Sequence, residues 1–237
     1  VRVVFSSLDS SVAGPIEEEF ANKGYIVISN SKNHRMDKDV PLLIPEVNPE
    51  HLGLIQVQRK RLGGKGFIVT NPNCTTIGLT MALKPLQDSF GISRVSVVSM
   101  QALSGAGYPG VPSLDAIDNV VPFISDEEEK VENEPLKLLG SVDNGKINAA
   151  KIIISAHCNR VGVRDGHLES VTVELIKKAK IEDVVKAFRD FKTLPQELKL
   201  PSAPKNPIIV REEEDRPQPV LDRDINKGMS VSIGRIR

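Results

Sequence analysis

A cysteine at the expected start of a helix is the strongest chemical feature of the sequence. Cys74 lies in TNPNCTTIG, where Asn73 can cap a helix that we expect over residues 75–90. The free N–H groups and the positive dipole end of a helix favour thiolate, so we expect the pKa of the Cys74 thiol to lie below its ordinary value. Such a thiolate is a nucleophile. For this residue alone, a small buried cysteine without chemistry is an equally good interpretation.

A thiol nucleophile needs a base, and His167 is the best placed of the four histidines. It follows a glycine turn in RVGVRDGHLES, and imidazole changes its protonation near neutral pH. His167 is also in phase with Val171 on one face of an expected strand, so a hydrogen-bonded core histidine is the competing interpretation. Arg160 lies an odd number of residues before His167, and we expect a turn or bulge at Gly162 or at Asp165–Gly166 to bring both to one side.

A polar, glycine-rich segment, SMQALSGAGYPG, follows another expected strand. Gln101 ends that strand, and Ser104 and Gly105 lie where the main chain could approach a ligand closely. Such turns are common, and the dinucleotide fingerprint G-x-G-x-x-G does not occur in the chain. Arg35 and Lys137 could hold a phosphate group, although isolated basic residues usually only solvate a surface.

Composition excludes several classes of protein. The 237 residues carry 31 Lys and Arg against 31 Asp and Glu, so no charge excess points to nucleic acid or to a membrane surface. Apolar runs stay far below the ~18 residues that a membrane span needs. Two cysteines, with Cys158 interpreted as structural, favour a reducing, cytoplasmic location. The chain opens on Val1 without a targeting signal, and we interpret it as a segment of a longer protein.

Hydrophobic spacing predicts two parts, divided near Asn73. The first part is α/β, because short buried strands alternate with helices, and it predicts a partial doubly wound sheet. Its expected strands are Val1–Phe5, Tyr25–Ser29, Pro41–Ile44 and Phe67–Thr70. The second part, residues 74–237, is α+β with longer strands that have one buried face. Its expected elements are strands Arg94–Met100, Lys151–Ser155 and 171–175 and a helix Ile181–Phe191. We interpret the acidic runs Asp126–Glu129 and Glu212–Asp215 as solvated surface.

The segments NPNCTT, SMQALSGAG, HCNRVGVRDGHLESV and the terminal RPQPVLDRDINKGMSVSIGRIR resemble the aspartate-semialdehyde dehydrogenases, particularly their archaeal and fungal branch. The resemblance covers the whole chain, and the motifs occur in the family's order. It implies a glyceraldehyde-3-phosphate-dehydrogenase-like fold, with residues 1–73 as the second part of an NADP-binding domain and residues 74–237 as a catalytic and dimerisation domain. It also implies reduction of L-aspartyl-4-phosphate by NADPH to L-aspartate 4-semialdehyde, on the route to lysine, methionine and threonine.

The resemblance assigns roles to individual residues. Cys74 would form an acyl thioester, His167 would be its acid/base partner, Gln101 would help to hold the intermediate, and Arg160 would grip the substrate carboxylate. The remaining assignments are binding residues: Glu134 for the substrate amino group, Arg35 and Lys137 for phosphate, and Ser104, Gly105 and Asn226 for the cofactor. No metal is implied.

Two features that the family normally has are absent from the sequence: the N-terminal glycine-rich phosphate turn and the last helix. We therefore expect weak or absent NADP binding by this chain alone. The alternatives are a related acyl-CoA or acyl-phosphate reductase, such as a malonyl-CoA reductase, and a noncatalytic dimerisation segment. Long half-apolar strands favour a homodimer, with a homotetramer left open.

Overall fold

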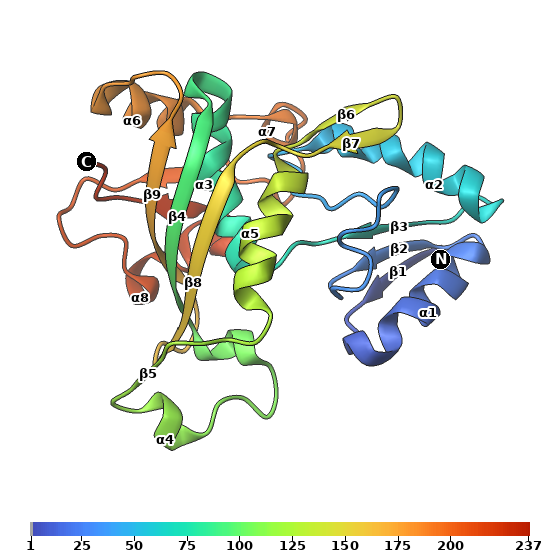
Figure 1. The fold of residues 1–237 in the computed structure, drawn as a ribbon, viewed down its shortest axis with the longest axis horizontal. Coiled ribbons are helices and arrows are strands. Elements are labelled where there is room, and N and C mark those ends of the chain that lie inside the picture. Colours follow the sequence, from blue (N-terminus) through green and yellow to red (C-terminus); the bar gives the residue numbers. More distant parts are fainter. Residues whose placement is uncertain (1) are drawn as a thin grey trace. The chain divides into compact units, whose positions relative to one another are not determined.

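The protein folds into two compact units, as a computed structural model of residues 2–237 shows (Figure 1). Val1, the start of the first expected strand, lies outside the described residues. The first unit contains residues 1–73 and 134–150, and the second contains residues 74–133 and 151–237. One break between the units lies after Asn73. Residues 134–150, however, also belong to the first unit. A single division of the linear sequence places them in the second part.

A three-stranded parallel sheet forms the centre of the first unit, in the order β1-β2-β3. Helices α1 and α2 pack on it, and a small antiparallel hairpin, β6-β7, completes the unit. The elements are β1 (Val3–Ser6), α1 (Ser10–Asn22), β2 (Ile26–Ser29), η1 (Pro49–Gly53), α2 (Leu54–Leu62), β3 (Phe67–Thr70), β6 (Ser141–Asp143) and β7 (Lys146–Asn148).

Local chemistry accounts for the bounds of these elements. Helix α1 begins after Asp9, whose carboxylate accepts a hydrogen bond from the Ser11 N–H. The strand expected at Pro41–Ile44 is wrong: only Leu42 forms a bridge, to Thr70. Pro41 begins this short segment and Pro45 follows it, and proline lacks the N–H group that a longer ladder needs.

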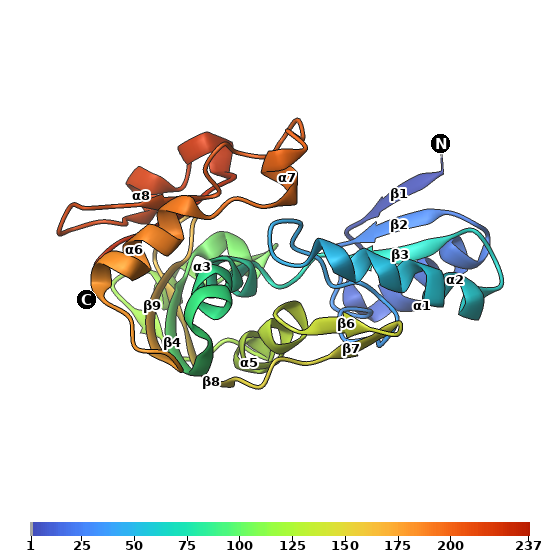
Figure 2. The same ribbon diagram turned by 90° about the horizontal axis from the view of Figure 1, so that it is seen from above.

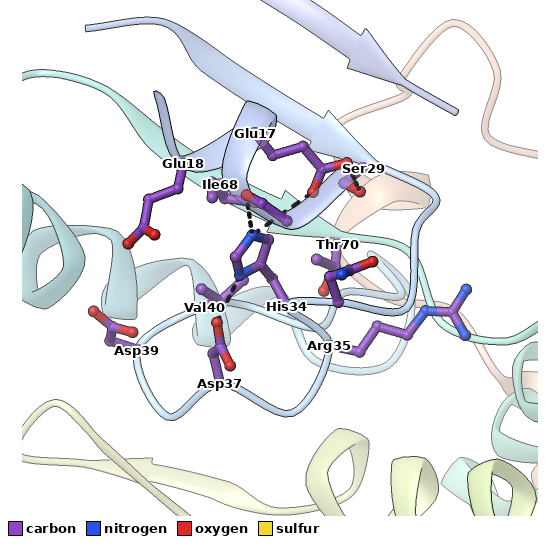
Figure 3. Close-up of polar contacts among 12 residues, drawn as sticks. Glu17, Glu18, Ser29, His34, Arg35, Asp37, Asp39, Val40, Ile68 and Thr70 are labelled. Atoms are coloured by element: carbon purple, nitrogen blue, oxygen red, sulfur yellow. Dashed lines mark hydrogen bonds and ion pairs between the residues drawn. The ribbon is translucent and has the colours of Figure 1, made fainter. Parts of the chain in front are cut away.

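A buried carboxylate joins the first helix to two strands (Figure 3). Glu17 is 1% exposed, and its Oε1 accepts hydrogen bonds from Ser6 Oγ at 2.5 Å and Ser29 Oγ at 2.7 Å. Its Oε2 lies 3.9 Å from His34 Nε2, whose ring also contacts Asp37 through Nδ1 at 2.7 Å. Asp37 raises the pKa of His34, so a positive ring is favoured near the Glu17 carboxylate.

A mixed four-stranded sheet, in the order β5-β8-β4-β9, forms the centre of the second unit. The inner strand β4 is parallel to β8 and antiparallel to β9. The elements are α3 (Cys74–Phe90), β4 (Ile92–Gln101), η2 (Leu103–Ala106), α4 (Ser113–Ala116), β5 (Val120–Val121), β8 (Ile153–Val161), β9 (Leu168–Leu175), α6 (Ile181–Asp190), α7 (Leu194–Glu197), β10 (Ile208–Val210), α8 (Pro219–Asp222), η3 (Ile225–Gly228) and β11 (Val231–Ile233).

Helix α3 covers one face of this sheet, as Figure 2 shows beside β4 and β9. Alternate residues of β4, such as Val95 and Val97, are buried on that face. On the other face, Val98 and Ile153 remain 43% and 62% exposed. The sheet therefore has the half-buried character that its alternating sequence predicts.

Helix α5 (Glu127–Leu138) is absent from the expected elements, and it runs from the second unit into the first. It starts within the acidic run Asp126–Glu129, and Glu127 there is only 6% exposed. The solvated-surface interpretation of that run is therefore wrong for Glu127. Among the described residues, no helix is long and apolar enough to span a membrane.

Candidate active site

The second unit brings Cys74 and His167 into contact. Cys74 is the first residue of α3, and His167 directly precedes β9. His167 Nε2 lies 3.1 Å from Cys74 Sγ, which is within reach of a hydrogen bond between a thiol and an imidazole. A glycine turn at Gly166, with φ of +88°, brings the strand back toward α3. The pair expected from residue types alone is therefore present in the fold.

The expected fall of the Cys74 pKa is wrong. Desolvation by surrounding protein atoms raises the pKa of this thiol, and the negative charge of Glu127 adds to the rise. Hydrogen bonds from Thr75 and from the main chain of Cys74 oppose it but are outweighed. Solvent still reaches Cys74, so the desolvation is partial. The helix terminus acts as predicted, but neighbours that the sequence did not identify reverse its effect.

The surroundings of His167 favour the neutral form of its ring. Burial lowers the pKa of the His167 ring, the nearby Arg160 lowers it further, and Glu127 opposes them. The ring has a second fixed contact, because the Ala102 N–H donates a hydrogen bond to His167 Nδ1 at 3.0 Å. Both ring nitrogens are thus engaged, one by the main chain and one by the sulfur of Cys74.

Arg160 lies on the same side as His167, as the expected turn requires. Its Nη1 donates to the Ala102 carbonyl at 2.6 Å, and the residue is 6% exposed. A Cβ atom at Gly105 would come within 3.0 Å of Arg160 Nη1 and 3.2 Å of His167 Cε1. Glycine is therefore the residue that leaves both side chains in place.

Gln101 has a fixed orientation because its amide nitrogen points at a carboxylate. Gln101 Nε2 donates to Glu127 Oε1 at 3.1 Å and to Ser99 Oγ at 3.3 Å. A carboxylate only accepts hydrogen bonds, so this contact places the amide oxygen on the opposite side. Sequence reasoning missed Glu127, and the only available signal was its position in the first turn of an unrecognised helix.

The first unit brings together the three residues expected to bind the amino group and phosphate. Arg35 Nη1 contacts Glu134 Oε1 at 3.0 Å, and Glu134 Oε2 accepts the Asn73 N–H at 2.7 Å. Lys137 Nζ donates to three main-chain carbonyls, at Arg35, Asp37 and Val40. Burial lowers the pKa of Lys137 to about 8. Arg35 thus contacts both of the other residues, Glu134 through its guanidinium and Lys137 through its carbonyl.

Two of the expected cofactor residues, Ser104 and Gly105, lie in η2 directly after β4. Asn226 lies in η3 with a φ of +50°, and its Nδ2 donates to Ser230 Oγ at 2.9 Å. Cys158 is buried in β8, as its structural interpretation predicts. His51 is fully buried and contacts the Gly140 carbonyl, a structural role like the one assumed for the histidines other than His167.

Two family models match the chain. The dimerisation domain of the semialdehyde dehydrogenases matches residues 83–237, and their NAD binding domain matches residues 1–55. Together they cover most of both compact units.

The chain is also similar to individual proteins along its whole length. It is 58% identical to an aspartate-semialdehyde dehydrogenase of Archaeoglobus fulgidus over 99% of this chain and 67% of that protein. It is 43% identical to a malonyl-CoA reductase (NADP) of Metallosphaera sedula over 100% of this chain and 68% of that protein. The crystal structure of aspartate-semialdehyde dehydrogenase with NADP from Candida albicans superposes with a TM-score of 0.91 at 42% identity, over 100% of this chain and 68% of that one.

Proposed function

The chain belongs to the aspartate-semialdehyde dehydrogenase family, and on this premise we propose that it reduces L-aspartyl-4-phosphate to L-aspartate 4-semialdehyde and phosphate with NADPH. The observation that carries the proposal is the contact of 3.1 Å between His167 Nε2 and Cys74 Sγ at the start of α3. A thiol beside an imidazole at a helix start is suited to acyl transfer through a thioester.

In this reaction the Cys74 sulfur attacks the acyl carbon, and the bond from that carbon to the phosphate oxygen breaks. The phosphate leaves with the electron pair, and a thioester remains on Cys74. The N–H groups at the start of α3 and the His167 ring lie around the sulfur and can stabilise the negative charge on the carbonyl oxygen. These residues must also keep water from hydrolysing the thioester before it is reduced.

Arg160 is the proposed partner of the substrate carboxylate. The Ala102 carbonyl accepts a hydrogen bond from Nη1 and so holds its guanidinium in one orientation. The remaining N–H groups form a planar fork suited to two carboxylate oxygens. Fixing the fork before binding reduces the conformational entropy that binding would otherwise cost.

For the other ends of the substrate, the family resemblance supports Glu134 for the amino group and Arg35 with Lys137 for phosphate. The buried Arg35 Nε has no hydrogen-bond partner among the described residues. Lys137 Nζ already donates to three main-chain carbonyls of residues 35–40. Its proposed contributions to phosphate binding are therefore its positive charge and the conformation in which it holds this loop. A phosphate would then be attracted to the cations without displacing Lys137.

The first unit offers groups that fit a nicotinamide dinucleotide. Its parallel strands end in exposed polar residues, where Asn30 Nδ2 donates to Ser7 Oγ and Asn71 Nδ2 donates to Asn30 Oδ1. The carboxyl edge of a parallel sheet is where such cofactors bind, and hydroxyl and amide groups suit ribose hydroxyls. When bound, NADPH would supply the hydride that reduces the thioester. In the second unit we propose Ser104, Gly105 and Asn226 as further contacts.

The second candidate function is malonyl-CoA reduction, which the similarity to the Metallosphaera sedula protein favours. A malonyl group has no amino group to pair with Glu134, so we rank this activity second. The test measures NADPH formation from aspartate semialdehyde, NADP and phosphate, and NADPH consumption with malonyl-CoA. We expect turnover of the semialdehyde, with a Cys74→Ser variant at least about a hundredfold slower. Turnover of malonyl-CoA without turnover of aspartate semialdehyde would contradict the proposal and favour malonyl-CoA reduction instead.

A homodimer is the proposed assembly, since the matched dimerisation domain spans residues 83–237. The uncovered sheet face, with Val98 and Ile153, is the proposed contact surface. Apolar residues on a flat exposed face are suited to a symmetric interface.

A further inference from the structure

The loop that follows β2 carries Arg35 and contacts helix α1 (Figure 3). We call residues 30–40 the Arg35 loop. Asn33 Nδ2 donates to the first carbonyl of α1 at 2.9 Å, and His34 Nε2 lies 3.2 Å from the Gly14 carbonyl oxygen. A Cβ atom at Gly14 would come within 3.1 Å of Asn33 Nδ2, so glycine allows the loop to approach the helix this closely.

Both ring nitrogens of His34 face oxygen atoms that accept hydrogen bonds. Nδ1 lies 2.7 Å from Asp37 Oδ2, and Nε2 lies 3.2 Å from the Gly14 carbonyl oxygen. A carbonyl has no hydrogen to donate, and neither has an ionised carboxylate. The hydrogen bond with His34 lowers the pKa of Asp37, so this carboxyl is ionised at neutral pH. Each ring nitrogen must therefore carry a hydrogen, and a ring that makes both contacts is an imidazolium.

The charged groups around His34 stabilise this positive form. Glu17 Oε2 lies 3.9 Å from His34 Nε2, is buried, and has no hydrogen-bond partner among the described residues. The carboxylate at the other ring nitrogen has the larger effect and, together with Glu17, raises the pKa of His34 against the desolvation of the ring. The next two carboxylates, Glu18 on α1 and Asp39 in the loop, pair with Arg61 instead.

The same loop supplies the groups of the proposed phosphate site. Arg35 extends away from the His34 ring (Figure 3), and its Nη2 donates to the Asn30 carbonyl at 2.9 Å. Lys137 Nζ donates to the main-chain carbonyls of residues 35, 37 and 40. The conformation of the loop therefore fixes the positions of both cations.

We propose that His34, as an imidazolium, is a positioning residue that holds the Arg35 loop against α1 and so keeps Arg35 and Lys137 in place for phosphate. This role rests on the proposed function. Loss of the proton leaves one ring nitrogen with a lone pair that faces an oxygen lone pair of Asp37 or Gly14, so one of the two contacts must break. Phosphate binding should then weaken, because the loop has to be ordered again when phosphate binds.

The first test measures hydrogen exchange of the main-chain amides of residues 35–40, several of which donate within the loop. Glutamine cannot place donors at both ring-nitrogen positions, so we expect His34→Gln to speed this exchange at least about tenfold. Lys38→Gln is the control, because it removes a positive charge from an exposed residue of the same loop. Equal exchange in the two variants would overturn the proposal. No substrate or cofactor is needed, so this test stands even if the proposed activity is wrong.

The second test observes the ring itself by 1H–13C NMR of the histidine side chains, with His34→Gln used to identify the His34 signal. We expect the positive form at neutral pH and a titration midpoint above the ordinary histidine value of about 6.5. In Asp37→Asn the midpoint should move to lower pH, since the partner has lost its charge. A neutral ring at about pH 6 in the unchanged protein would overturn the proposal.

The third test separates KM from kcat in the oxidation of aspartate semialdehyde with NADP and phosphate. At about pH 6.5 we expect His34→Gln to raise the KM for phosphate at least about fivefold, with kcat little changed, because the ring does not touch the reacting atoms. Lys38→Gln should raise this KM less, since it leaves the loop contacts in place. An equal rise in the two variants would show that charge alone is responsible and would overturn the proposal.

The pH dependence of the same KM provides a further check. The ratio of the KM of His34→Gln to that of the unchanged protein should fall toward one as pH rises, because the unchanged protein then loses the His34 proton as well. Titration of phosphate and of Lys137 affects both proteins alike and cancels in the ratio. A ratio that stays constant with pH would overturn the proposal. Absence of semialdehyde turnover in the unchanged protein would instead contradict the proposed function, and the first two tests would still decide whether the ring holds the loop.

Discussion

Gly105 lies where any side chain would crowd two residues of the site. A methyl group there would meet Arg160 Nη1 at 3.0 Å and His167 Cε1 at 3.2 Å, closer than ordinary contact. We expect Gly105→Ala to lower kcat/KM for aspartate semialdehyde at least about tenfold, because both side chains must shift from their fixed orientations. Gly53→Ala is the control, since a methyl group at Gly53 meets nothing within 4 Å. Equal activity of the two variants would contradict this assignment.

Glu169 should make stability fall with rising pH. It lies on β9 opposite Ser99, is half-buried, and burial raises its pKa from 4.5 to about 8. A raised carboxyl pKa means that the fold prefers the neutral form, so its contribution is full below the unfolded pKa and is lost as pH rises through about 8. Above that pH, Glu169→Gln should melt at least about 3 °C higher than the unchanged protein.

Thermal melts of the two proteins across the pH range provide the measurement for Glu169. At low pH, where Glu169 is already neutral in both states, the two melting temperatures should converge. Glu174→Gln, an exposed carboxylate on the same strand, should change little at any pH. A constant difference between Glu169→Gln and the unchanged protein would show that the effect is not titration of this carboxyl.

The two reacting residues were predictable from sequence, whereas their surroundings were not. Cys74 precedes an apolar helical pattern and His167 follows a glycine turn, and both signals are local. Ala102 contacts His167 and Arg160 through its main-chain N–H and carbonyl, so its residue type does not indicate these contacts. Glu127 lies in an acidic run that resembles solvated surface, and only the fold directs it to Gln101 and toward Cys74. The wrong direction for the Cys74 pKa follows first from desolvation by surrounding protein atoms, which the local sequence does not show, and second from the charge of Glu127.

At the scale of elements, Glu17 ties α1 to the first two strands of the sheet. Its Oε1 accepts from Ser6 and Ser29, and the carboxylate is almost fully buried. We expect Glu17→Ala to lower the free energy of unfolding of the first unit by about 3 kcal/mol, since two buried hydroxyls lose their acceptor. Urea denaturation measures this, with the exposed neighbour Glu18→Ala as control. A loss no greater than that of the control would show that the cluster contributes little.

Elements with strong local periodicity were predicted well, and those defined by distant partners were not. Phe67–Thr70 is a strand with the expected bounds, and Ile181–Asp190 is a helix within one residue of its expected end. The α5 helix has an acidic first turn, an internal proline and few apolar residues, so its sequence lacks a clear apolar stripe. Within the first unit, Lys137 donates to the Arg35 carbonyl and Glu134 accepts from the Asn73 N–H, so distant partners hold the last part of the helix.

At the scale of the whole molecule, the return of residues 134–150 to the first unit shows why a linear division is incomplete. Helix α5 begins beside Gln101 in one unit and ends with Lys137 bound to carbonyls of the other. Nothing in the composition changes at Glu134 to mark the crossing. Discontinuous units of this kind depend on contacts between distant segments, which residue patterns do not record.

The uncovered face of the β4–β8–β9 sheet should be the surface through which two copies associate. Val98 on β4 and Ile153 on the adjacent strand β8 are exposed there. The register of the two strands pairs Val98 with His157 and Arg94 with Ile153. A charge in the middle of such a face would be desolvated on association, at a cost of several kcal/mol. We therefore expect Val98→Glu to shift the protein from dimer to monomer at micromolar concentration in sedimentation velocity. Leu52→Glu, at an exposed apolar residue of η1, should sediment like the unchanged protein, and a dimeric Val98→Glu variant would place the interface elsewhere.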